Sequence, residues 1–248
     1  MINYMKSESY RLLRKNGTHV TGLLCLLLIS AAAATLYFFD QFDPNFPYAT
    51  SKFFYSNVIS GGLLIIIVGL IFNISLTGKD LSLLKQSVSF GISRNTIFWS
   101  KLILTLSYFL LLCAVGIIVM IVLGESLFTG ENQSVSNFLI ACLNMAPIVL
   151  SGFFLTHSLK MLKVGEVYII LVLAFIFGFS DSLLRVFRSF SGLRELREYA
   201  PSTLLNDNLM SFLDNTVQFD FKYWAVGIII SVISLLIGAK RFANKNID

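Results

Sequence analysis

The side chains that most often perform catalysis or bind metals are few in this sequence and far apart. The two histidines, His19 and His157, lack the His-Glu-x-x-His spacing and the paired carboxylates of a metal site, so we expect each to lie at an interface or to hydrogen-bond between helices. Cys25, Cys113 and Cys142 each lie within an apolar run, and no Cys-x-x-Cys pair occurs. This pattern predicts small buried side chains rather than disulfides or metal ligands.

Motifs for nucleophilic catalysis and for phosphate binding are missing from the sequence as well. It contains no Gly-x-Ser-x-Gly element, typical of a serine nucleophile, and no Gly-x-x-x-x-Gly-Lys-Ser/Thr loop, which cradles nucleotide phosphates. We therefore expect a chain that is not an enzyme and does not hydrolyse ATP by that mechanism. No cofactor site and no nucleic-acid site is visible in the sequence.

The segments around these residues are dominated by apolar side chains. Of 248 residues, 56% are apolar and 13% are charged, and the mean hydropathy is +0.77. A water-facing globule of this size cannot cover so much apolar surface, and the composition excludes disordered, collagen-like, coiled-coil and disulfide-scaffold classes. The sequence predicts an all-α integral membrane protein.

Uncharged runs long enough to cross a bilayer set the expected number of spans. A span needs about 20 mainly apolar residues, and six such segments can be assigned, the fifth with the shortest uncharged run. All six belong to one transmembrane domain that covers 1–248. The expected spans are 18–39, 56–77, 102–123, 138–158, 164–180 and 223–239.

The distribution of basic residues predicts how these spans are oriented. With both termini in the cytoplasm, 13 of the 19 lysines and arginines lie on the inner side and 6 on the outer side. The net charge of +5 is therefore attributed to topology rather than to nucleic-acid binding. We expect a multi-pass protein of the cell membrane with both termini in the cytoplasm.

Two segments outside the spans have helical patterns of their own. Residues 1–16 predict an amphipathic helix on the inner leaflet, with an apolar face formed by Ile2, Met5, Leu12 and Leu13; a solvated basic tail is the alternative. Residues 181–222 are rich in Leu and Phe and predict an extracellular segment of two or three short amphipathic helices. Within it, Asp181 and Arg185 have the spacing of a helical ion pair, and Pro201 marks a break and a new helix start.

The loop between the second and third spans carries the most specific pattern. Leu81, Leu84 and Val88 fall on one helical stripe, Gly91 breaks the helix, and Ser93 can cap a second helix that leads into the third span. Such a helix suits docking to a cytoplasmic partner, and a connector packed against lipid headgroups is the alternative. The residues assigned to this coupling helix are Asp80, Leu81, Leu84, Lys85, Val88, Gly91, Ser93 and Arg94.

A few polar residues and prolines interrupt or border the spans. Such groups usually face other helices, so we assign them to helix packing within one subunit or to gating. Glu166, one turn into the fifth span, is expected to pair with Lys163 at the interface. The residues in this group are Asn73, Asn144, Pro147, Glu166 and Pro201.

The layout of six spans, a basic amphipathic N-terminal helix and an inner helix between spans two and three resembles the permease subunit of ABC-2 type transporters. The inner loop LLKQSVSFGISRNTIFWSKL is similar to that family's Gly-x-Ser/Thr-Arg element running into a Lys-bearing third span. The break at Tyr199-Ala200-Pro201 resembles the family's external hairpin. The stretch Thr77-Gly78-Lys79-Asp80 departs from the acidic residue that members often carry before the inner helix, which Asp80 would supply here.

The resemblance implies partners that the chain itself does not contain. A separate cytoplasmic ABC ATPase, which binds ATP and Mg, would dock on residues 79–94, and a second permease subunit would complete a homodimer or heterodimer in the lipid bilayer. Small permeases of this kind resemble Gram-positive exporters of amphipathic or antimicrobial peptides, such as phenol-soluble modulin exporters and lanthionine bacteriocin immunity transporters. The alternatives are an ABC-type drug or lipid exporter, a gradient-driven secondary carrier and a membrane sensor.

Overall fold

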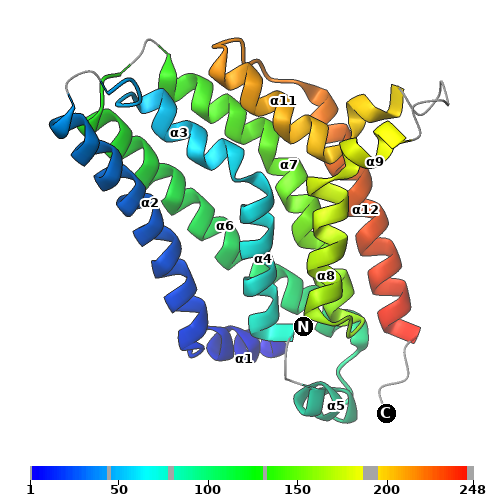
Figure 1. Ribbon diagram of the computed structural model, residues 1–248. Helices are drawn as coiled ribbons and strands as arrows, with labels where there is room; N and C mark the ends of the chain where they lie inside the picture. The colour runs from blue at the N-terminus through cyan, green and yellow to red at the C-terminus, as the bar shows by residue number, and fades with distance from the viewer. Residues whose placement is uncertain (1, 44–45, 78–80, 131–132, 187–194, 245–248) are drawn as a thin grey trace.

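The computed structural model describes the chain except for residues 1, 44–45, 78–80, 131–132, 187–194 and 245–248 (Figure 1). The described part is helical, with one isolated bridge between Thr50 and Thr129 and no β-strand. The elements are α1 (Ile2–Leu13), α2 (Asn16–Phe42), α3 (Ser51–Ser60), α4 (Gly62–Thr77), α5 (Leu81–Ser89), α6 (Arg94–Leu127), α7 (Ser134–Met161), α8 (Glu166–Leu173), the π-helix η1 (Ala174–Gly178), α9 (Ser180–Val186), the 3-10 helix η2 (Arg197–Tyr199), α11 (Pro201–Leu213) and α12 (Phe221–Asn244).

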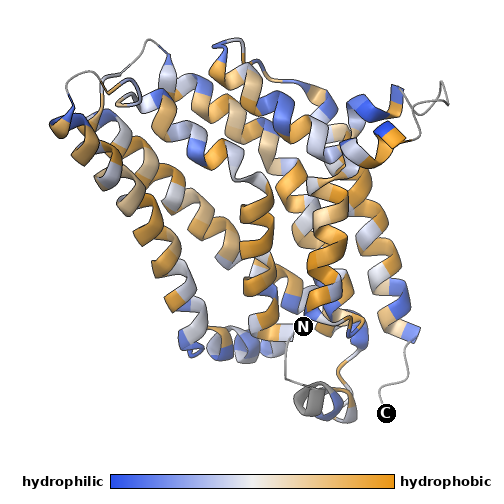
Figure 2. Ribbon diagram, viewed as in Figure 1, coloured by the Kyte–Doolittle hydropathy of each residue, from blue (hydrophilic) through white to orange (hydrophobic). Residues whose placement is uncertain are grey.

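Four helices are individually long and apolar enough to cross a membrane, namely α2, α6, α7 and α12. Two bent pairs reach the same length and hydropathy together, α3 with α4 and α8–η1 with α9, so the described chain has four to six candidate spans. Apolar side chains cover these helices along most of their length (Figure 2). The expectation of an all-α chain with membrane-spanning helices is confirmed at this level.

The second expected span, 56–77, is not one straight helix. Helix α3 ends at Ser60, α4 begins at Gly62, and their axes differ by 56°. Sharp kinks commonly occur at Gly and Ser pairs, and this bend lies at Ser60-Gly61-Gly62. A Cβ atom at Gly62 would lie 2.9 Å from Leu205 Cδ2, so this glycine also allows α11 to approach the bend.

The fifth expected span, 164–180, is interrupted as well. After eight α-helical residues the chain widens into a π-helical turn, in which the N–H of Phe179 donates to the carbonyl of Ala174 at 2.9 Å. Helix α9 then leaves at 70° to the first part. Wide π turns are often found at functional sites in helices, and this one directs α9 toward α11 and η2.

Helix α7 is the centre of the bundle, because it packs against α12, α4, α11 and α3. Its closest neighbour is α12, which approaches through two glycines. A Cβ at Gly227 would lie 2.5 Å from the carbonyl oxygen of Pro147, and one at Gly238 would lie 2.4 Å from Ser158 Oγ. Small residues at such positions let helix backbones pack closely in membranes.

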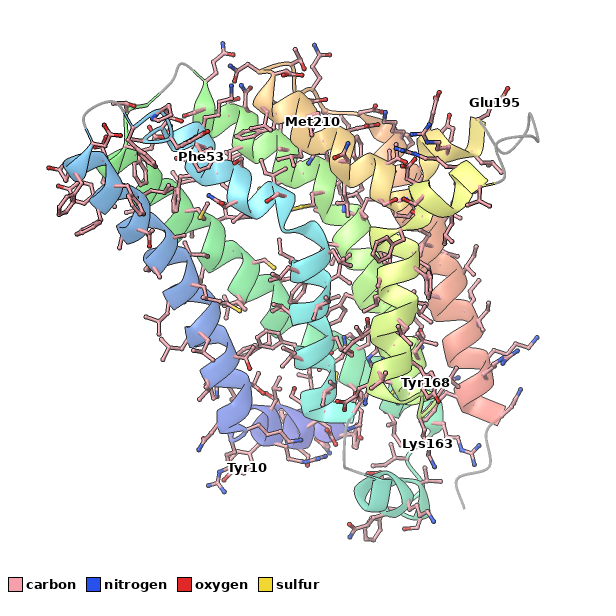
Figure 3. The ribbon with its side chains drawn as sticks, viewed as in Figure 1. Tyr10, Phe53, Lys163, Tyr168, Glu195 and Met210 are labelled. Carbon is pink, nitrogen blue, oxygen red and sulfur yellow. The ribbon has the colours of Figure 1, made fainter. Side chains whose placement is uncertain are left out.

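The remaining elements cover the two ends of the bundle (Figure 1). Helices α1 and α5 lie at one end, where the C-terminal end of α12 also lies, and we call this the α1 end. Helix α11 lies across the opposite end, over α3 and α7. Figure 3 shows Tyr10 and Lys163 at the α1 end and Met210 and Glu195 at the other.

Candidate functional site

A short helix, α5, forms in the loop where the coupling helix was expected, and it lies at the α1 end. It ends before Gly91, which has a φ of 80° in the left-handed region that glycine adopts without strain. The hydroxyl of Ser93 then accepts a hydrogen bond from the N–H of Thr96 at 3.2 Å and caps α6. The break at Gly91 and the new start at Ser93 are therefore confirmed. Asp80 lies outside the described residues, as do the side chains of Leu81 and Leu84.

The described side chains of α5 and of the turn after it divide into two groups. Val88 and Ile92 are half-buried and pack against a cluster at the α1 end of the bundle formed by Ile97, Phe98, Met161 and Phe242. Lys85 is exposed, and Phe90 is 75% exposed. Val88 thus holds α5 against the bundle, and the surface offered to other molecules carries Lys85, Gln86, Ser89 and Phe90.

Arg94 also faces its own chain. Its Nη1 atom donates to the carbonyl of Ala243 at 2.9 Å, near the C-terminal end of α12. A positive side chain is stabilised there because helix C-termini carry partial negative charge. Arg94 therefore ties the start of α6 to the end of α12.

The N-terminal residues form a helix, α1, but it presents to the bundle a different face from the expected apolar one. Of the expected apolar face, Leu12 is buried, whereas Ile2 and Leu13 are exposed. The inward side is instead formed by Tyr4, Glu8 and Leu12, which are spaced four residues apart. Glu8 is 2% exposed, so a carboxylate occupies the middle of the buried face.

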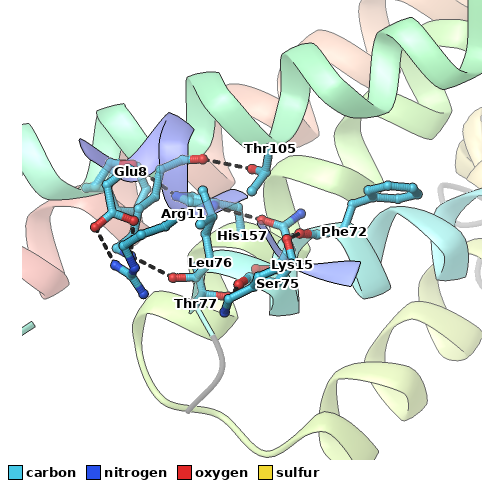
Figure 4. A network of polar contacts seen from close by, with 12 residues as sticks. Glu8, Arg11, Lys15, Phe72, Ser75, Leu76, Thr77, Thr105 and His157 are labelled. Carbon is cyan, nitrogen blue, oxygen red and sulfur yellow. Dashed lines mark hydrogen bonds and ion pairs between the residues drawn. The ribbon is translucent and has the colours of Figure 1, made fainter. Parts of the chain in front are cut away.

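The partner of this carboxylate is a lysine on α6 (Figure 4). Lys101 Nζ lies 3.0 Å from Glu8 Oε2, and Lys101 is itself 2% exposed. The same nitrogen donates to the carbonyl of Leu76 at 2.6 Å, and Arg11 Nη1 donates to Glu8 Oε1 at 2.7 Å. We call Glu8, Arg11, Lys101 and the Leu76 carbonyl the junction cluster. It fixes α1, the end of α4 and the start of α6 to one another.

Two lysines from distant parts of the chain cap the end of α4. Lys101 donates to the carbonyl of Leu76, and Lys15, between α1 and α2, donates to the carbonyl of Ser75. The last carbonyls of a helix have no partner within it, so donors from elsewhere satisfy them. The capping role of Lys15 and Lys101 was not predicted from the sequence.

Tyr4 connects the junction cluster to α5. Its phenol lies beside the side chains of Glu8 and of Ser87 on α5, and its ring packs with the cluster that contacts Val88. Burial, followed by the neighbouring carboxylate of Glu8, raises the pKa of Tyr4 well above its ordinary value of about 10. The phenol therefore stays protonated and can donate a hydrogen bond at physiological pH.

A second polar contact lies just inside the junction cluster (Figure 4). His157 of α7 is fully buried, with Nδ1 at 2.8 Å from Asn73 Oδ1 on α4 and Nε2 at 3.2 Å from the carbonyl of Phe98 on α6. This confirms that His157 hydrogen-bonds between helices and assigns Asn73 to helix packing. Three helices are joined through one imidazole.

Asn144 fastens α7 to the segment that precedes α12. Its amide nitrogen donates to the carbonyl of Gln218 at 2.9 Å and to Asn208 Oδ1 at 3.3 Å, and its oxygen accepts from the N–H of Asp220 at 3.2 Å. Asn208 in turn donates to the carbonyl of Ala141 at 3.0 Å. All four bonds lie within this chain, so Asn144 has a packing role in this structure.

Pro147 lies inside α7, which continues through it to Met161. Its carbonyl is the backbone group that Gly227 of α12 approaches. The glycine at 227 has no side chain to hold the two backbones apart at this point. Pro147 therefore belongs to the tightest part of the α7–α12 contact.

Glu166 pairs with a different lysine from the one expected. Its Oε1 atom lies 3.3 Å from Nζ of Lys160, the buried residue near the end of α7, and not from Lys163. The reason is geometric, because Lys163 has a φ of 63° in the turn between the helices. Figure 3 shows Lys163 at the α1 end of the bundle and Tyr168 on α8.

Pro201 is the first residue of α11 and confirms the expected break and new start. Beside it, Ser202 Oγ lies 2.8 Å from Ser180 Oγ and accepts from the N–H of Asp181 at 2.8 Å. Asp181 pairs with Arg185 at 2.8 Å, as its spacing predicts, and with Arg197 of η2. Residues 187–194 of the expected 181–222 segment lie outside the described residues.

These groups connect elements of the bundle through hydrogen bonds and ion pairs. Within the described part of the chain, no group of three or more His, Cys, Asp and Glu residues is arranged to hold a metal ion. The polar side chains at the α1 end instead connect α5, α1, α4, α6 and α7. No family model, curated protein or solved structure matches this chain.

Proposed function

We propose that this chain is the permease subunit of an ABC-type exporter, with six spans in the cell membrane and both termini in the cytoplasm. The observation that carries the proposal is the position of α5 at the α1 end of the bundle. One side of this segment is anchored through Val88, while Lys85 and Phe90 remain exposed. An exposed aromatic ring beside a flexible cation suits a protein partner, because aromatic anchors are enriched at interfaces. The partner in this proposal is a separate cytoplasmic ABC ATPase, which binds ATP and Mg.

Movement of α5 would reach the spans by two connections. One is the short turn Gly91–Ser93, which leads directly into α6. The other runs from Ser87 through Tyr4 to Glu8 and Lys101. Because Lys101 also holds the last turn of α4, a push on α5 would displace α1, α4 and α6 as a unit. Rigid-body movement of packed helices is a common form of conformational switching.

The cargo in this proposal is an amphipathic or antimicrobial peptide that leaves a Gram-positive cell. Aromatic rings exposed on α8, on η1 and directly after η1 support it, with Tyr168 at 68%, Phe175 at 51% and Phe179 at 56% exposure. Such a face suits either a second permease subunit, identical or different, or the apolar side of a peptide. A drug or lipid is the alternative cargo for the same surface.

The test is purification from the native membrane in mild detergent, with identification of co-purifying chains and an ATP hydrolysis assay. Lys85→Glu and Phe90→Asp change the exposed surface at α5. Phe219→Asp is the matched control because Phe219 is 57% exposed and directly precedes α12, which begins at the opposite end of the bundle. We expect an ATPase to accompany the wild type and the control but not the two α5 variants.

The alternatives give different results in the same assays. A chain that purifies alone, with no ATPase bound or stimulated, contradicts the proposal. A secondary carrier would instead require a proton or sodium gradient, and Glu166→Gln would reduce that dependence because carriers use ionisable groups in or near the membrane. A sensor would keep the ATPase but move no cargo.

A further inference from the structure

A cavity of about 400 Å³ lies between α2, α3–α4, α6 and α7. Its inner walls include Phe109 of α6 and Met145 and Val149 of α7, which are 1 to 6% exposed. Its rim includes Leu28 of α2 and Leu64 of α4, which are 68% and 62% exposed. The cavity therefore opens sideways between α2 and α4, on a surface of apolar helices, and not toward an end of the bundle.

The cavity is elongated along the helices. On α6 its lining extends from Phe109 to Met120, a rise of about 16 Å at 1.5 Å per residue. On α2 and α7 it is lined by the middle of each helix, at Cys25–Ala32 and Cys142–Leu150. One leaflet contributes about half of a hydrocarbon core of about 30 Å. The length of the cavity thus matches the depth of one layer of acyl chains.

The lining has almost no hydrogen-bonding groups. Asn57 is the polar side chain that borders it, and its amide nitrogen already donates to the carbonyls of Phe53 and Phe54 at 3.2 and 3.1 Å. Apolar cavities exclude water. An extended peptide would leave its N–H and C=O groups without partners there. A hydrocarbon chain has no such groups.

We propose that this cavity binds an acyl chain of a phospholipid from the surrounding bilayer. The chain would enter between Leu28 and Leu64 and lie against the inward faces of α6 and α7. Dispersion contacts with these walls would favour binding of the acyl chain, because wall atoms that face an empty cavity have no contacting atoms on that side. By filling the space between α2 and α4, the acyl chain would set the position of α2. This inference does not depend on the proposed transport function.

The test uses the full chain in vesicles of phosphatidylglycerol and phosphatidylethanolamine, with a trace of phosphatidylglycerol that carries a photoreactive diazirine in one acyl chain. Irradiation is followed by mass-spectrometric mapping of the labelled residues. We expect label on the buried residues Phe109, Met145 and Val149 in addition to Leu111 and Ile118. The last two are 61% and 60% exposed on α6 and report ordinary contact with the bilayer.

Filling the cavity should remove only the label on the residues that line it, Phe109, Met145 and Val149, which we call the inner label. Ala146 lines the cavity on α7, so Ala146→Phe places a ring inside it. Leu143→Phe is the matched control, because Leu143 is 51% exposed on the same helix and does not line the cavity. We expect Ala146→Phe to lose the label at Met145 and Val149 and to keep it at Leu111 and Ile118, while Leu143→Phe labels like the wild type.

Three outcomes would overturn the proposal. The first is wild-type label confined to Leu111 and Ile118, a result that requires no variant to fold. The second is inner label that persists in a folded Ala146→Phe variant. The third is displacement of the inner label by an unlabelled amphipathic helical peptide, which would assign the cavity to peptide instead. Each outcome is independent of whether an ATPase binds α5.

Discussion

Glu8 and Lys101 lie 93 residues apart in the sequence, and their side chains form an ion pair of 3.0 Å in which both are about 97% buried. Two additional hydrogen bonds support the pair, one from Arg11 to Glu8 and one from Lys101 to the Leu76 carbonyl. Desolvation opposes such a pair, so its net contribution to stability is small, but removing one partner leaves a buried charge without compensation. The pair therefore determines where α1 lies more than how stable the bundle is.

Glu8→Gln tests this interpretation. Lys101 would keep its charge and lose the neighbouring carboxylate of Glu8. We therefore expect the free energy of unfolding to fall by about 3–5 kcal/mol. The measurement is the rate of thermal inactivation in detergent, since unfolding of membrane proteins is commonly irreversible. Lys101→Met should lower stability less than Glu8→Gln does, because Glu8 still pairs with Arg11. The double variant Glu8→Leu with Lys101→Met removes both charges of the pair and should be more stable than Glu8→Gln. Lys6→Ala, on the exposed side of α1, is the control. Equal inactivation rates for Glu8→Gln and Lys6→Ala would contradict the interpretation.

Gly227→Ala tests the contact between α7 and α12. The new Cβ would lie 2.5 Å from the Pro147 carbonyl oxygen, a backbone atom that cannot move aside alone, so the helices must separate. We expect the free energy of unfolding to fall by about 1–3 kcal/mol, as is typical of overpacking. Gly116→Ala is the control, because its nearest neighbour would be the flexible tip of Ile29 at 3.7 Å. If both variants inactivate at the wild-type rate, the close approach is not a stabilising contact.

The elements that were predictable from the sequence have local signals. Uncharged runs mark α2, α6, α7 and α12, because hydropathy over about 20 residues reports a span directly. Gly91 and Ser93 were identified because helix ends depend on residue type at fixed positions. The bend at Ser60-Gly61-Gly62 was missed because the prediction of spans relied on hydropathy, and so short a break inside an apolar run barely changes the hydropathy of the run. The π turn at Ala174–Gly178 has no sequence signal of its own.

The contacts of the candidate site were harder to predict because they join distant parts of the chain. Glu8 belongs to a basic, surface-type helix, and only the position of Lys101 in space makes its burial favourable. This ion pair explains why α1 presents Glu8 inward and leaves Ile2 exposed, the reverse of a purely hydrophobic orientation. Likewise, Glu166 selects Lys160 over Lys163 because of the conformation of the turn, which charge spacing does not report.

Asp181 makes the contact between α9 and η2 dependent on pH. Its hydrogen bond from Arg197, followed by that from Arg185, lowers the pKa of this carboxyl below its ordinary value. A lowered pKa in the folded state means that the stabilisation is complete above the unfolded value of about 3.9 and is lost as pH falls through the folded value. Arg197 and Arg185 are 41% and 61% exposed, so we expect the ion pairs of Asp181 to contribute only about 0.2–1 kcal/mol to stability at neutral pH.

Asp181→Asn is the variant that isolates this effect. At pH 7 it should inactivate slightly faster than the wild type, and the difference should shrink in acid, because the wild-type carboxyl then becomes neutral too. Asp214→Asn is the matched control, since Asp214 is an exposed aspartate near the same end of the bundle. A difference between Asp181→Asn and the wild type that is constant from pH 7 down to pH 3 would show that charge is not the cause.

Tyr4→Phe tests whether α5 is coupled to the spans through α1, and it depends on the proposed function. The variant keeps the ring in its cluster and removes the hydroxyl that lies beside Glu8 and Ser87. Loss of one such polar contact costs about 1 kcal/mol, so the chain should still fold and bind its ATPase. We expect ATP hydrolysis to continue while the cargo exported per ATP falls. Tyr10→Phe is the control, because Tyr10 is 57% exposed on the same helix. Equal export per ATP in the two variants would leave the Gly91–Ser93 turn as the connection that carries the movement.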